Sequence, residues 1–126
     1  MKNPFQLDTK APLVFIKGQR KGYLQIATSE IITKYKNLPD YLLLAAKDWV
    51  TSLEGLGAKK VYWISLSEVV EHLHIHLYPR WSDTESKGIQ LFEERNNSDL
   101  KQPNWTTEEE KKLYEWVSKW KAEQAY

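Results

Sequence analysis

The chain has 126 residues, a length that corresponds to one domain. Its 18 basic and 17 acidic residues give a formal net charge of +1, so bulk charge does not favour a nucleic-acid polymer as a partner. The apolar fraction of 41% excludes a disordered chain, and the lack of cysteine excludes disulfides and thiolate zinc sites.

Residues 1–9 lack the apolar core of a signal peptide. No stretch of the chain approaches the roughly 18 apolar residues that a membrane-spanning helix needs. We therefore expect a soluble, cytoplasmic protein that has no membrane partner.

Two strands joined by a tight loop are expected first. The runs 13–17 and 23–28 are rich in β-forming apolar residues, and the loop 18–22 between them has the glycines of a hairpin. Arg20 and Lys21 in this loop are expected to be solvated turn residues.

A long amphipathic helix is expected to begin at 38–40, where Pro39 and Asp40 suit the first turn. Apolar residues then recur at spacings of three and four up to Leu56, and nearby glycines end the pattern. This stripe predicts a helix that packs across a sheet. Residues 60–67 alternate between two faces and predict a strand that pairs antiparallel with the next one.

The stretch 72–81 carries the most chemistry. It holds all three histidines of the chain, and they alternate with aliphatic residues in the period-2 pattern of a half-buried strand: His72, Leu73, His74, Ile75, His76, Leu77. On one strand the outer two histidines lie about 13 Å apart, which disfavours a single metal ion bound by all three. An imidazole can instead attack an electrophile and form a covalent intermediate.

The last third of the chain has a different composition. Residues 82–104 are predicted to form a long surface loop with one apolar island at 89–92. Thr106 and Glu109 form a capping box that begins a helix running to about Gln124. The tryptophans of this helix are expected to cover the sheet or to belong to a dimer interface.

The run from His72 to Tyr78 resembles the signature of the histidine-triad (HIT) family, His-φ-His-φ-His-φ-φ with φ apolar, and Pro79-Arg80 follows as in many members. The resemblance covers residues 13–81 well and the C-terminal third loosely. The short turn near 65–70 resembles that of the diadenosine polyphosphate hydrolase-like branch. The resemblance implies an α+β fold, with an antiparallel sheet of about five strands, one long helix and a C-terminal helix. We expect one domain over 1–126, with its core at 13–81 and a loop and C-terminal helix at 82–126.

The resemblance also implies a function. HIT proteins are hydrolases and transferases that act at the α-phosphate of nucleotides such as dinucleoside polyphosphates and nucleoside phosphoramidates. By this resemblance His74 is the nucleophile, and His72 and His76 hold phosphate oxygens or assist the leaving group. Neither a cofactor nor a metal is implied, the partner is a nucleotide substrate, and a homodimer is expected because HIT proteins commonly dimerise.

The sequence departs from the family pattern at three places, and one of them is the region of Lys17 and Gly18, where the acidic residue that often grips the ribose is not evident. Gly22-Tyr23 stands where many members have Gly-His, and the Asn and Gly-Gln pair of the later turn are absent. We expect four residues to contact the substrate: Tyr23, Ser65, Glu68 and Arg80. Two alternatives stay open, which are a non-catalytic nucleotide-binding module and a His-x-His metal-binding protein.

Overall fold

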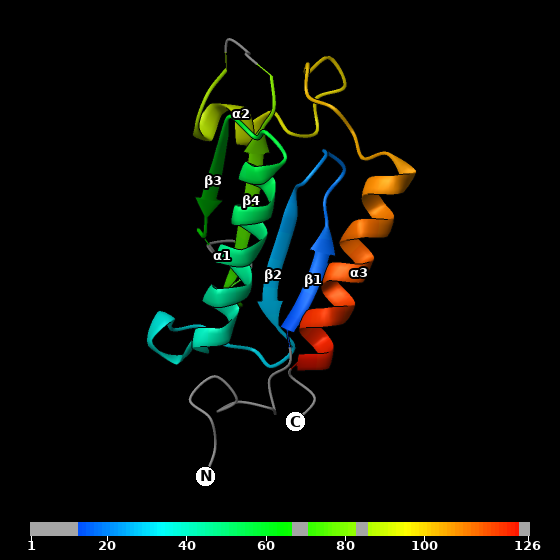
Figure 1. Cartoon of the computed structure of the whole chain (residues 1–126). Helices are drawn as coiled ribbons and strands as arrows, with labels where there is room; N and C mark the ends of the chain where they lie inside the picture. Colours follow the sequence, from blue (N-terminus) through cyan, green and yellow to red (C-terminus); the bar gives the residue numbers. More distant parts are fainter. Residues whose placement is uncertain (1–12, 67–70, 83–85, 124–126) are drawn as a thin grey trace.

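The computed structural model describes residues 13–66, 71–82 and 86–123. The elements in chain order are β1 (Leu13–Lys17), β2 (Leu24–Thr28), the short 3-10 helix η2 (Tyr35–Asn37), α1 (Asp40–Gly55), β3 (Lys60–Ile64), β4 (His74–Arg80), α2 (Ile89–Glu93) and α3 (Thr107–Glu123). Figure 1 shows this arrangement.

The four strands form one antiparallel sheet in the order β1-β2-β4-β3. This confirms the α+β fold with an antiparallel sheet, a long helix and a C-terminal helix. The described residues form four strands rather than about five. Strand β3 ends at Ile64, earlier than predicted, and β4 begins at His74 rather than at His72.

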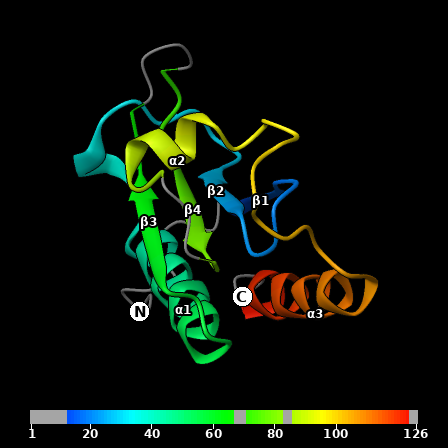
Figure 2. The same cartoon turned by 90° about the horizontal axis from the view of Figure 1, so that it is seen from above.

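The helices lie on both faces of the sheet. Figures 1 and 2 show α1 and α3 on one face and α2 on the other. The apolar stripe of α1 packs on β2 and β4, as predicted, and the three elements form most of the main core. Its buried residues include Leu42, Ala45, Ala46, Trp49 and Leu53 from α1, Leu24 and Ile26 from β2, and Ile75 and Leu77 from β4. Within the described part of the chain, none of the helices is long and apolar enough to cross a membrane.

The predicted capping box begins α3. The backbone N–H of Thr106 donates to Glu109 Oε1 at 2.9 Å, and the N–H of Glu109 donates to Thr106 Oγ1 at 3.2 Å. Further along the helix, the indole N–H groups of Trp116 and Trp120 both donate to Asp48 Oδ2 of α1, each at 2.9 Å. The tryptophans therefore tie α3 to α1 over the sheet, as one of the two predictions for them required.

The prediction of a long surface loop over 82–104 is wrong at its apolar island. Residues 89–93 form α2, and Leu91 and Phe92 are buried. They pack with Tyr23 and Tyr78 into a second, smaller core on the face of the sheet that carries the histidines. The physical reason is that this face has apolar surface of its own, which the island covers.

Candidate functional site

The strand β4 places two of the three histidines on one face of the sheet. His74 and His76 are half-buried, whereas Ile75 and Leu77 are buried on the opposite face, as the alternation predicted. The two imidazole rings are neighbours, with centroids 4.8 Å apart. His72 lies before the strand begins, so the expectation that all three histidines share one regular strand is wrong.

Both ring nitrogens of His72 are used within the fold. The backbone N–H of Ile32 donates to Nδ1 at 3.1 Å, which makes Nδ1 the acceptor. The other nitrogen, Nε2, lies 2.7 Å from the carbonyl oxygen of Thr28, and because a carbonyl only accepts, Nε2 carries the proton. His72 therefore joins the end of β2 and the segment after it to the start of β4.

His74 has one nitrogen bound and one available. Its Nδ1 lies 2.9 Å from the carbonyl oxygen of His72, so Nδ1 carries the proton and donates it. In the neutral ring this leaves the lone pair on Nε2. An unprotonated Nε2 on a half-buried imidazole is the form that attacks an electrophile.

His76 is held by Tyr23, the residue just before β2. The phenol oxygen of Tyr23 lies 2.7 Å from His76 Nδ1 and also accepts a long hydrogen bond of 3.5 Å from the amide of Gln25. Burial raises the pKa of Tyr23 above its ordinary value, against the opposing effect of the nearby Arg95 guanidinium, so the phenol keeps its proton. We infer that the phenol donates to Nδ1, which leaves His76 Nε2–H as a donor on the open side of the ring.

The charge state of His76 follows from its surroundings. Burial, and after it the neighbouring His74 and Arg95, together lower the pKa of His76 to about 4. His76 is therefore neutral at physiological pH. It can donate a hydrogen bond to an anion but carries no positive charge of its own.

Arg95, two residues after the end of α2, brings a positive charge close to His76. Phe92 packs edge-on against His76, with ring centroids 4.9 Å apart. The guanidinium of Arg95 lies 4.0 Å from the Phe92 ring centroid, and its Nη1 donates to the Phe92 carbonyl at 2.9 Å. Arg95 is thus held in place beside the ring that contacts His76. The apolar island at 89–92 pointed to Phe92, whereas no local pattern pointed to Arg95.

Arg20 holds the loop after α2 in place through hydrogen bonds to its backbone. It is 7% exposed, and its guanidinium donates to backbone carbonyls of the loop after α2: to Arg95 O at 3.1 Å, to Gln102 O at 2.9 Å and to Asn97 O. The expectation that Arg20 is a solvated turn residue is therefore wrong. Its neighbour Lys21 is also engaged, in an ion pair with Glu109 at 2.9 Å. The hairpin loop thus anchors the chain that carries Arg95.

The other predicted substrate-binding residues lie at different places. Ser65 follows directly after β3, and its hydroxyl accepts from the Tyr35 hydroxyl at 3.1 Å. Arg80 lies at the far end of β4, opposite Lys60, on the histidine face because the register from 76 to 80 is unbroken. Tyr23 is buried, so it contacts His76 rather than open solvent. Glu68 lies outside the described residues.

The described residues around the histidines do not form a metal-binding cluster. Over the residues that the structure describes, no three His, Cys, Asp or Glu side chains are close enough to hold a metal ion. His72 has both nitrogens bound to backbone groups, so it has no lone pair to offer.

No protein-family model matches the chain, and no curated protein matches it in sequence. Among solved structures, the chain is similar to the crystal structure of a Hit-like protein involved in cell-cycle regulation from Bartonella henselae, which contains an unknown ligand. The two share 14% identity with a TM-score of 0.42, over 88% of this chain and 79% of that one.

Proposed function

We propose that the protein is a HIT-type nucleotide hydrolase or nucleotidyl transferase that acts at the α-phosphorus of a dinucleoside polyphosphate or a nucleoside phosphoramidate. One observation carries the proposal. The Nδ1–H of His74 donates to the His72 carbonyl, which leaves the Nε2 lone pair as the free nucleophile. The triad motif at 72–78 supplies the substrate class.

The proposed reaction has two steps. First, His74 Nε2 forms a bond to the α-phosphorus, and the bond from phosphorus to the leaving oxygen or nitrogen breaks, so that the leaving group departs with the bonding electron pair and takes up a proton. Water or another acceptor then attacks the same phosphorus and displaces His74. The products of hydrolysis are a nucleoside monophosphate and the unmodified imidazole.

Three residues near His74 have different roles in the proposed reaction. His76 donates from Nε2 to a phosphate oxygen, and because it is neutral it acts as a hydrogen-bond donor rather than as a cation. Arg95 supplies the fixed positive charge that offsets the negative charge on the phosphate. His72 positions the strand, since both its nitrogens are bound.

A non-catalytic nucleotide-binding module is the second candidate. The observation that favours it is the replacement of the family's imidazole by Tyr23, which lies against His76 and cannot contact substrate from its buried position. Such a protein would bind nucleotides at the same face and release them unchanged.

We also propose that the protein is a homodimer that acts in the cytoplasm. Strand β3 lies at the edge of the sheet, where it pairs only with β4 among the described strands, and Trp63 on it is 45% exposed. An open edge strand offers backbone groups to a second copy. Sedimentation at micromolar concentration is expected to give a dimer, and a monomer would contradict this assembly.

The experiment that tests the function is a turnover screen. Purified protein is incubated with adenine and guanine dinucleoside polyphosphates and with adenosine phosphoramidate, beside the variant His74→Asn. We expect nucleoside monophosphate from at least one class in the wild type and none from the variant. Binding measured by calorimetry without any turnover would favour the binding module instead.

A further inference from the structure

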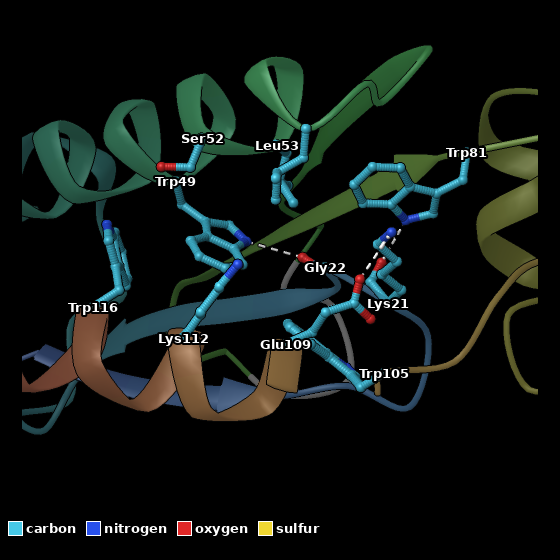
Figure 3. Close-up of a pocket in the computed structure, with 11 residues that line it drawn as sticks. Lys21, Gly22, Trp49, Ser52, Leu53, Trp81, Trp105, Glu109, Lys112 and Trp116 are labelled. Atoms are coloured by element: carbon cyan, nitrogen blue, oxygen red, sulfur yellow. Dashed lines mark hydrogen bonds and ion pairs between the residues drawn. The ribbon is translucent and has the colours of Figure 1, made fainter. Parts of the chain in front are cut away.

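A second concave site lies on the face of the sheet opposite the histidines, between α1 and α3 (Figure 3). It encloses about 320 Å³. Four of the six tryptophans of the chain line it: Trp49, Trp81, Trp105 and Trp116. The proposed nucleotide chemistry uses none of these residues, because the sheet separates them from His74.

The four indole rings are fixed by their own hydrogen bonds. Each N–H donates within the protein: Trp49 to Gly22 O at 2.9 Å, Trp81 to Lys21 O at 2.7 Å, Trp105 to Gly18 O at 2.7 Å and Trp116 to Asp48 Oδ2 at 2.9 Å. A ligand therefore meets ring faces and edges rather than indole donors. Rigid aromatic walls favour a flat ligand that stacks, since little ordering is needed when it binds.

The protein already places its own cations on two of these rings. Lys21 Nζ lies 4.3 Å from the Trp81 ring centroid and 2.9 Å from Glu109 Oε2. Lys17 Nζ lies 5.8 Å from the Trp105 ring centroid. A cationic ligand on these rings would lie close to two positive charges that repel it, so the site disfavours cations.

The few polar groups that line the cavity distinguish between neutral and anionic ligands. The hydroxyl of Ser52 donates to the Asp48 carbonyl at 3.1 Å, which leaves little for a polyol to bind. Lys112 extends from α3 into the gap between the two helices (Figure 3), and among the described residues it has no ion-pair partner. The charged lining residues, two lysines and Glu109, sum to +1.

We propose that this cavity binds a flat aromatic anion, a carboxylate or sulfonate carried on about two fused rings. The volume is at the small end of the range of about 300–1,000 Å³ for ligand sites, which suits a ligand of that size. Its rings stack among the tryptophans, and its charge pairs with Lys112.

The test uses three matched probes and the indole N–H resonances of the full chain. 2-Naphthoate, 2-naphthalenemethanol and 2-naphthylmethylammonium have the same rings and differ in charge. With 2-naphthoate we expect the resonances of Trp49, Trp81, Trp105 and Trp116 to shift, with a Kd of about 1 mM or lower. Trp63, on the exposed edge strand, serves as the internal control and is expected not to shift.

Charge selectivity decides the ligand class. We expect the anion to bind most tightly and the cation most weakly. Lys112→Gln is expected to weaken 2-naphthoate binding about twofold to fivefold and to leave the alcohol unchanged. The matched variant Lys111→Gln, an exposed lysine next to it on α3 that does not line the cavity, is expected to have no effect.

Several results would overturn the proposal. The cation binding as tightly as the anion, equal effects of the two lysine variants, or shifts at Trp63 as large as those at the lining residues would each contradict it. No shift with any probe, as expected if a second copy or another segment of the chain fills the cavity, would also overturn it. None of these outcomes depends on turnover at His74.

Discussion

The phenol oxygen of Tyr23 lies 2.7 Å from Nδ1 of His76, and this contact sets which nitrogen of His76 faces the open side of the site. The position of the Tyr23 ring depends on Gly18, because a Cβ at that residue would collide with the ring. The glycine of the hairpin loop thus makes room for the residue that orients His76.

Replacing Tyr23 with Phe removes this donor and keeps the ring packing. We expect the variant to stay folded and to lose about 10- to 100-fold in kcat, because His76 is no longer held in one orientation. Nitrogen-15 spectra of the imidazoles provide the decisive readout. They are expected to show an increased population of the Nδ1–H tautomer of His76, and an unchanged tautomer with unchanged kcat would contradict the role given to Tyr23.

The pKa of His76 predicts how stability depends on pH. Burial lowers this pKa to about 4 in the folded state, whereas an unfolded histidine titrates near 6.5. Between these two values the unfolded chain binds more protons than the folded chain, so the free energy of unfolding falls as the pH falls from about 6.5 to about 4. Urea unfolding across this window is the measurement. His76→Gln is expected to show a shallower decline, and an identical slope in the two proteins would be evidence against the lowered pKa.

His72 is expected to contribute to stability more than to chemistry. His72→Ala leaves the Thr28 carbonyl and the Ile32 N–H without their partner, which is expected to cost about 1–3 kcal/mol in the free energy of unfolding. His72→Gln, which can restore one of the two hydrogen bonds, is the matched control. Its free energy of unfolding is expected to lie between those of His72→Ala and the wild type. A His72→Ala protein as stable as the wild type but without turnover would instead give His72 a direct role.

The sequence predicted the elements of the sheet well because strand periodicity is local. The alternation of histidines with Ile75 and Leu77 assigned the two faces of β4 correctly, since successive side chains of any strand point to opposite sides. The stripe of α1 and the capping box of α3 were found for the same reason.

The parts that were not predicted depend on contacts far along the chain. His72 leaves the strand pattern because its partners, Ile32 and Thr28, lie 40 and 44 residues earlier. Arg20 has the sequence context of a solvated turn, and only the carbonyls of the loop after α2, at least 75 residues later, make it a buried residue. No local pattern encodes such partners.

Arg95 is expected to bind the charge of the substrate. Arg95→Met keeps a long side chain over Phe92 but removes the guanidinium, and we expect KM for the nucleotide to rise about 10-fold or more, as for the loss of a charge-assisted hydrogen bond. Arg95→Lys, which keeps the charge, is expected to retain part of the affinity. The pKa of His76 is expected to rise in Arg95→Met, because the guanidinium is one of the groups that lower it. Unchanged KM and an unchanged His76 titration would leave Arg95 with a packing role only.

The central claim is that His74 Nε2 becomes bonded to the α-phosphorus of the substrate. The most direct measurement mixes excess enzyme with the best substrate of the screen, quenches within one turnover under alkaline conditions, and maps the modified residue by peptide mass spectrometry. We expect one nucleotidyl group on His74 in the wild type and no adduct in His74→Asn, which stays folded because His74 faces away from the main core and is only half-buried. Full turnover by folded His74→Asn, or an adduct on another residue, would contradict the account.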